Sequence, residues 1–308
     1  VNAQTMIRLG GLHFSLASNI HPLLASAKYR KLHQDAQGAM GPLLQALRDP
    51  GSRGVIVSEV RDFYRAGDFK QLAGMVGVLG PLDTVWPWDP SYEPAPEDSV
   101  KARATREGRS AVEVIYDVLS RPEEKHGGVL WRPLFNYARG DLESVRESLQ
   151  NDIFTPGFAD GGAHVRFVCD ATTATHLLTH WVRDRTRGPK FPIEFVVKKH
   201  TKDTAAIFGM TDRGELRPGM KADLNLIDLD GLRILAPRFV HDLPLQAGRW
   251  VQDVEGYRMT IVSGEVTFQD GKPTGALPGG LVRNALSVGL AAGPKGTVPP
   301  AARAAAVP

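Results

Sequence analysis

The chain has almost no cysteine, because Cys169 is the only one among its 308 residues. A single thiol excludes an intrachain disulfide and agrees with a reducing compartment. The sequence also has no run of about 18 consecutive apolar residues, so no transmembrane helix is expected. Its first residues, Val1–Arg8, lack the basic and then apolar layout of a signal peptide. These absences together predict a cytoplasmic protein.

An excess of charge of one sign is missing as well. The formal net charge is only +3, from 37 basic and 34 acidic residues. Neither nucleic acid nor an acidic membrane surface is therefore expected as a partner. Hydrophobic residues make up 42% of the chain and charged residues 23%, which is typical of globular proteins. A chain of this length can bury a large core in one or two domains.

Strand-like and helix-like segments alternate up to about residue 209, which favours an α/β layer with parallel strands. A strand is expected over residues 3–12 and a second apolar segment over 129–137. Helices are expected over residues 22–80 with a break at 49–51, and over 98–120, 141–150, 172–187 and 193–208. Ser110 and Glu113 have the spacing of a capping box.

The pattern changes after residue 210. Short strands are expected over residues 224–229, 258–263 and 265–269, and Gly264 joins the last two as a hairpin. The end of the chain is rich in Ala, Gly and Pro, a composition that cannot bury enough surface to order itself. Three parts follow: an α/β part over residues 1–209, a small β unit over 210–283, and a disordered tail over 284–308.

The most informative segment runs from Phe154 to His164 and reads F-T-P-G-F-A-D-G-G-A-H. A short apolar run that stops at Asp160 is typical of a buried strand of a parallel sheet. A carboxylate at the C-terminal end of such a strand lies where α/β enzymes place their chemistry. The two glycines that follow leave this carboxylate uncovered. The alternative interpretation is an aspartate that caps an ordinary turn.

Downstream residues favour the catalytic interpretation. Residues 212–224, D-R-G-E-L-R-P-G-M-K-A-D-L, resemble the segment by which amidohydrolase-superfamily enzymes leave their barrel and enter a small β-sandwich. Within that superfamily, several stretches are similar to the N-acyl-D-amino-acid deacylases, or D-aminoacylases: Asn136-Tyr137, Asp160 to His164, Leu178 to Trp181, Arg183 to Arg185, His241 to Pro244, Gly256-Tyr257 and Thr274 to Gly279. The resemblance covers most of residues 1–283. It implies an α/β fold, the C-terminal part of a TIM-like (β/α)8 metal-dependent hydrolase barrel plus a small β-sandwich unit.

The resemblance also implies a reaction. A zinc-activated water would cleave the linear amide bond of an N-acyl-D-amino acid, with acidic amino acids as one option. Asp160 matches the carboxylate that takes the proton from this water and passes it to the leaving amine, and it is also a candidate metal ligand. Hydrolysis of a cyclic or another amide by the same chemistry is an alternative, because one fold hosts many substrates.

The main metal ligands implied by the resemblance are missing from this chain, which contains no His-x-His pair. We therefore expect the chain to match the C-terminal portion of a longer enzyme and to be inactive alone. The alternative is a non-catalytic truncated homologue that acts as an assembly module. Half a barrel leaves unpaired strand edges, so self-association is expected.

A substrate carboxylate requires a cation, and arginine suits it better than lysine. Arg8, at the end of the first strand, and Arg166, just past Asp160, are the candidates, and His164 is a candidate pocket residue. His176 and His180 have a spacing that can place two imidazoles on one metal, but packing of their helix is the favoured interpretation. The loop from Trp86 to Pro94 is either a lid over the acyl group or packing at the barrel edge.

Overall fold

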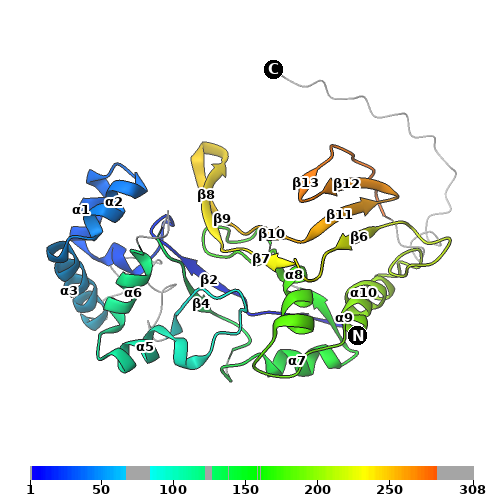
Figure 1. The fold of residues 1–308 in the computed structure, drawn as a ribbon, viewed down its shortest axis with the longest axis horizontal. Helices are drawn as coiled ribbons and strands as arrows, with labels where there is room; N and C mark the ends of the chain where they lie inside the picture. Colours follow the sequence, from blue (N-terminus) through cyan, green and yellow to red (C-terminus); the bar gives the residue numbers. More distant parts are fainter. Residues whose placement is uncertain are drawn as a thin grey trace, which may run out of the picture.

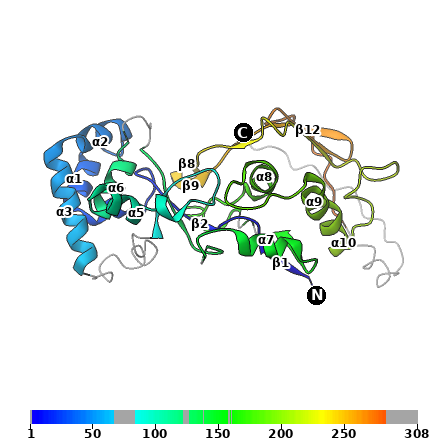
Figure 2. The same cartoon turned by 60° about the horizontal axis from the view of Figure 1, so that its bottom comes forward.

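The computed structural model describes residues 2–66, 84–121, 127–137, 139–157, 159 and 161–282. Two groups of helices lie at opposite ends of its long axis, and the strands β2 and β4 lie between them (Figures 1 and 2). The expected tail, residues 284–308, lies outside the described residues. Within the described part of the chain, no helix is long and apolar enough to cross a membrane.

The first group of helices forms the larger hydrophobic core. Its helices are α1 (Ala27–Asp35), α2 (Met40–Leu47), α3 (Pro50–Ala66), α5 (Val100–Glu107) and α6 (Ala111–Leu119), with short 3-10 turns at Pro22–Ala25 and Pro96–Asp98. The break between α2 and α3 confirms the one expected at residues 49–51. The capping box is confirmed too, because Ser110 Oγ accepts from the Glu113 amide and the Glu113 carboxylate accepts from the Ser110 amide. Phe14, Ile56 and Ile115 are fully buried in this core.

The expected strand over residues 3–12 is interrupted. It forms β1 (Ala3–Met6) and β2 (Gly11–Phe14), which belong to different sheets. β1 pairs in parallel with β5 (Phe154–Gly157), in register from Ala3↔Phe154 to Met6↔Gly157. β2 pairs antiparallel with β4 (Leu130–Pro133), which also pairs with β3 (Trp86–Pro87). A Cβ on Gly11 would lie 2.6 Å from Trp131 Nε1, so this close approach of β2 to β4 requires glycine.

The architecture is therefore mixed α/β. Among the described residues, β1 and β5 form the one parallel pair, and the strands close no barrel. The expectation of a parallel α/β layer holds for this pair, whereas the neighbouring three-stranded sheet is antiparallel. The sequence pattern shows which segments are buried and extended, but it does not show which of them pair.

The second group of helices contains two irregular helices. α8 (Thr173–Leu178) continues into a π-helix over Thr179–Asp184, and α9 (Ile193–Lys198) continues into a π-helix over Lys199–Asp203 and then α10 (Thr204–Ile207). The sequence predicts both as uninterrupted helices. α7 (Glu143–Gln150) lies beside the β1–β5 pair and completes this group.

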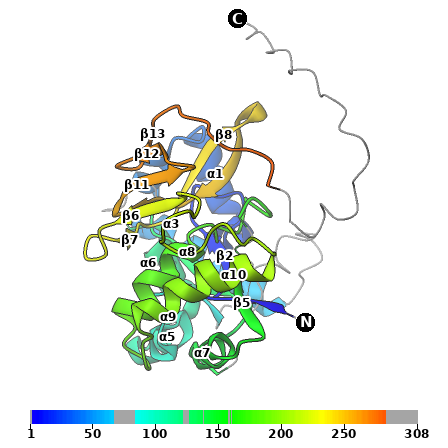
Figure 3. The same cartoon turned by 90° about the vertical axis from the view of Figure 1, so that its right-hand side faces the viewer.

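The small β unit lies over α8, α9 and α10 (Figure 3). Its strands are β6 (Leu224–Ile227), β7 (Arg233–Ile234), β8 (Arg238–Leu243), β9 (Ala247–Val251), β10 (Val254–Glu255), β11 (Tyr257–Val262), β12 (Glu265–Gln269) and β13 (Lys272–Pro273). One sheet has the order β13-β12-β11-β6, and β8–β9 and β7–β10 form separate antiparallel pairs. The hairpin through Gly264 is confirmed: Ser263 has φ 54° and Gly264 has φ 84° in its turn.

Candidate functional site

The C-terminal ends of β1 and β5 lie at the same edge of the structure, because the two strands pair in parallel. Arg8 follows β1, and residues 161–170 follow β5. Groups that follow neighbouring parallel strands meet at this edge, where α/β enzymes place their chemistry. Asp160 belongs to the segment after β5 by sequence, but it lies outside the described residues.

Arg8 is fully buried, with an exposed fraction of 0%. Its Nη2 forms an ion pair with Asp170 Oδ1 and donates to the Cys169 carbonyl oxygen at 2.7 Å. Its Nη1 lies 3.5 Å from Thr172 Oγ1, and its guanidinium carbon lies 3.9 Å from the centroid of the Tyr92 ring. The sequence predicted Arg8 as a ligand for a substrate carboxylate. In the structure a carboxylate of the chain itself, Asp170, takes that place, and no face of Arg8 is open to solvent.

His164 and Arg166 both lie on an exposed part of the segment after β5. The Trp250 amide donates to the Val165 carbonyl at 2.7 Å, and the His13 amide donates to the Phe167 carbonyl at 2.8 Å. These two bonds tie the segment to β9 and β2 and leave the Arg166 side chain in solvent. His164 and Arg166 are therefore exposed, whereas Arg8 is buried.

Glu93 is the centre of a buried polar cluster that the sequence did not reveal. Its side chain is 1% exposed and accepts from Arg185 Nη2 and Nε, both at 3.1 Å, and from His180 Nε2 at 2.9 Å. The Leu142 amide donates to it at 2.8 Å, at the start of α7. Burial acts to raise the pKa of Glu93, but the hydrogen bonds from His180, Arg185 and Leu142 outweigh it and lower the pKa to about 2.

The loop that carries Glu93 is packed into the structure. Tyr92 is fully buried, and its ring meets those of Trp131 and His176 edge-on at centroid distances of 5.2 and 5.9 Å. Its hydroxyl donates to Gln252 Oε1 at 3.0 Å, between β9 and β10. These contacts favour packing over a lid. The sequence did not pair Glu93 with Arg185, because the two residues are 92 positions apart.

His176 and His180 are both buried, and their rings stack with centroids 4.6 Å apart and an interplanar angle of 16°. His176 Nε2 lies 2.8 Å from the Ser91 carbonyl oxygen, while His180 Nε2 bonds to Glu93. Burial, together with the neighbouring His180, holds the pKa of His176 well below its ordinary value. In the described part of the chain, no group of three or more His, Cys, Asp or Glu is arranged to hold a metal. These residues therefore do not fit a zinc site.

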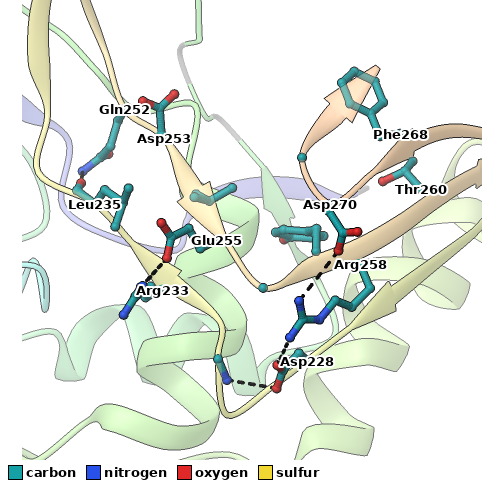
Figure 4. A pocket seen from close by; sticks show the side chains of 15 residues that line it. Asp228, Arg233, Leu235, Gln252, Asp253, Glu255, Arg258, Thr260, Phe268 and Asp270 are labelled. Atoms are coloured by element: carbon teal, nitrogen blue, oxygen red, sulfur yellow. Dashed lines mark hydrogen bonds and ion pairs between the residues drawn. The ribbon is translucent and has the colours of Figure 1, made fainter. Parts of the chain in front are cut away.

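A cavity of about 960 Å³ opens in the small β unit (Figure 4). Its four lining carboxylates are all paired with arginines: Asp228 and Asp270 with Arg258, Glu255 with Arg233, and Asp253 with Arg238. Because these carboxylates are paired with arginines, they are poorly suited to act as a general base in hydrolysis. The edge after β1 and β5 is therefore the better candidate site.

Comparisons with known proteins give one family match. The sequence model described as the amidohydrolase family matches residues 90–268. None of the curated proteins matches the chain.

Solved structures similar to this chain include a D-aminoacylase described as defining a novel subset of amidohydrolases. It is 24% identical with a TM-score of 0.33, over 62% of this chain and 35% of that one. A D-aminoacylase studied for its binuclear metal centre is 26% identical with a TM-score of 0.33, over the same shares of the two chains. An N-acyl-D-glutamate deacylase from Bordetella bronchiseptica, complexed with zinc and a phosphonate inhibitor, is 24% identical with a TM-score of 0.32, over 62% and 37%. The chain thus spans little more than a third of these structures.

Proposed function

The chain belongs to the amidohydrolase family, and we propose that it is the C-terminal part of a cytoplasmic hydrolase that cleaves the linear amide bond of N-acyl-D-amino acids. The observation that carries this proposal is the parallel pairing of β1 with β5. Their C-terminal ends present the segment after β5 at the edge where α/β enzymes react. In the same proposal, residues 1–209 are part of a TIM-like barrel and residues 210–283 a small β-sandwich.

Three residues of the segment after β5 have roles in this proposal. Asp160 takes a proton from the attacking water and returns it to the leaving amine, which requires a carboxylate within hydrogen-bond reach of both. Arg166 is exposed and binds the substrate carboxylate, for which the fork of a guanidinium is well shaped. His164 lines the same exposed surface. A D-amino acid with an acidic side chain would place a second carboxylate near this cation.

The proposed hydrolysis requires zinc to activate the attacking water. The described residues do not fit a metal site. We propose that its main ligands are missing from this chain, with Asp160 as one further candidate ligand. The chain by itself is then expected to be inactive.

The test compares the 308-residue chain with the product of the whole reading frame that encodes it. Release of free amino acid from N-acetyl-D-glutamate, N-acetyl-D-leucine and their L-isomers would be measured with added zinc. The longer product should hydrolyse the D-isomers, and Asp160→Asn should lower its kcat at least about 100-fold. Asp152→Asn is the matched control, because the Asp152 side chain is fully exposed. Equal loss in both variants would refute the role of Asp160, and hydrolysis by the chain alone would refute its inactivity.

A second candidate function is that of a non-catalytic assembly module. Two open strand edges favour it: among the described residues, β1 pairs only with β5, and β6 is an edge strand that exposes Leu224 and Leu226. Sedimentation of the chain should then show dimers or larger species, and Leu226→Asp should shift them towards monomer. A monodisperse monomer at high concentration would contradict this candidate.

A further inference from the structure

Residues 161–170 are held at both ends. One end continues from β5, which lies in register beside β1. The other end, Cys169-Asp170, is bound by Arg8, which follows β1. Asp170 also lies close to the turn after β1, because a Cβ built on Gly10 would be 3.5 Å from Asp170 Oδ2. The segment therefore forms a loop that Arg8 closes by non-covalent contacts.

Breaking the contacts of Arg8 would cost considerable free energy. The side chains of Arg8 and Asp170 are 1% and 3% exposed, so water does not screen their ion pair. Removing one partner of a buried ion pair leaves a charge that neither water nor protein compensates. The Tyr92 ring covers one face of the guanidinium, and Thr172 lies beside Nη1. A guanidinium held in this way fixes its neighbours and is not free to bind a solute.

The middle of the segment has fewer anchors. The Val165 carbonyl accepts from an amide of β9 and the Phe167 carbonyl accepts from an amide of β2, while residues 161–164 are exposed. Loss of the Arg8 contacts would remove the ion pair and the carbonyl hydrogen bond at Cys169-Asp170. That end would still be held by the packing of Cys169 with Phe239 and Trp250 and by the bonds from Thr173 to the Asp170 carbonyl. Positions of reacting groups must be kept to within about 0.5 Å, so loss of the Arg8 contacts matters for catalysis.

We infer that Arg8 is a positioning residue, which clamps the end of residues 161–170, the segment that carries His164 and Arg166, at the C-terminal edge of β1 and β5. Its catalytic meaning rests on the proposed function, but the clamp itself can be measured without any activity. This role replaces the substrate-binding role that the sequence suggested for Arg8.

Cys169 is a built-in reporter for the clamp. It is the only thiol of the chain and is 6% exposed, and its own carbonyl accepts from Arg8. Burial raises the pKa of its thiol to about 12, so the reactive thiolate is suppressed while the segment is closed. Modification by a disulfide reagent therefore reports how often the segment opens.

The experiment measures the rate at which Ellman's reagent modifies Cys169 in the native chain, at several urea concentrations well below the unfolding midpoint. Arg8→Gln should raise this rate at least tenfold, and Arg8→Lys should restore part of the protection, because lysine keeps the charge but not the fork. The added rate should depend little on urea, since local opening exposes little surface. Arg233→Gln, which removes an exposed arginine from a Glu255 pair, is the matched control and should react like the parent chain.

Two results would overturn the inference. One is equal protection of Cys169 in the parent chain and Arg8→Gln. The other is a higher rate with the full urea dependence of global unfolding, which would mean that Arg8 only stabilises the fold. If Arg8→Gln does not fold, Arg8→Lys and Asp170→Asn carry the same measurement. Asp160→Asn should leave the thiol rate unchanged, so a failure of the proposed hydrolysis and a failure of the clamp remain distinguishable.

Discussion

Replacing Glu93 by glutamine keeps the size of the side chain but removes the charge at the centre of a buried cluster. The parent carboxylate accepts from Arg185, His180 and the Leu142 amide. Glutamine offers one oxygen and turns an NH2 group towards these donors. Arg185, whose side chain is 0% exposed, then keeps its buried charge with Glu143 at 3.5 Å as its remaining carboxylate.

Two independent arguments give the size of the effect. Breaking a buried ion pair by removing one partner costs about 3–5 kcal/mol of unfolding free energy. The pKa of Glu93 falls from its ordinary 4.5 to about 2 in the folded chain, and this difference corresponds to about 3 kcal/mol. We therefore expect Glu93→Gln to lower the unfolding free energy by about 3 kcal/mol and Tm by about 6–12 °C.

The assay is urea unfolding followed by circular dichroism, with Glu143→Gln as the matched control. Glu143 faces the same Arg185, but its side chain is 30% exposed, so its loss should cost less than about 1 kcal/mol. Equal costs for the two variants would show that burial of Glu93 is not what matters. A cost below about 1 kcal/mol for Glu93→Gln would refute the reasoning altogether.

The same cluster predicts a pH dependence. The folded-state pKa of Glu93 lies below the unfolded value, so its contribution to stability is complete above about pH 4.5 and is lost as the pH falls towards 2. The difference in unfolding free energy between the parent chain and Glu93→Gln should therefore be largest near neutral pH and shrink below about pH 4. A difference that stayed constant down to about pH 3 would contradict this sign.

Two local predictions follow from the backbone, and both are read out by urea unfolding. Gly256 has φ +104°, and a Cβ there would lie 2.5 Å from Leu232 Cα, so Gly256→Ala should cost at least about 2 kcal/mol. Gly54 in α3 has no atom within 4 Å of such a Cβ, so Gly54→Ala should instead stabilise by up to about 1 kcal/mol, and any loss of stability there would contradict the prediction. Ser110→Ala removes the capping box of α6 and should cost about 1 kcal/mol, whereas Ser58→Ala, at a half-buried position inside α3, should be nearly neutral.

The sequence predicted those features that a few neighbouring residues determine. The break between α2 and α3 falls at residues 48–49, directly before Pro50. Ser110 and Glu113 cap α6, and Gly264 lies in the β11–β12 turn. The β8–β9 hairpin was not predicted. Its turn uses Leu245 and Gln246 at φ 57° and 58°, a conformation that usually calls for glycine or asparagine, so the sequence carries no turn signal there.

The contacts of the candidate site could not be predicted from the sequence, because they join residues that are far apart along the chain. Arg8 and Asp170 are separated by 162 positions, and Glu93 and Arg185 by 92. No local pattern tells which arginine meets which carboxylate, and an arginine next to an aspartate on a helix is usually solvated. The spacing of His176 and His180 did place them on one helix face, where they stack, but it did not show that Ser91 and Glu93 bind them.

The contacts of Tyr92 and Glu93 favour packing over a lid for the loop between Trp86 and Pro94. Tyr92 and Glu93 are neighbours in the sequence but contact two different buried arginines. The Tyr92 ring covers Arg8, and the Glu93 carboxylate binds Arg185. Opening the loop would take both cations away from their partners at once, at a cost of several kcal/mol for each. A lid has to open at little cost on every turnover. We therefore expect this loop to stay in place when a substrate binds.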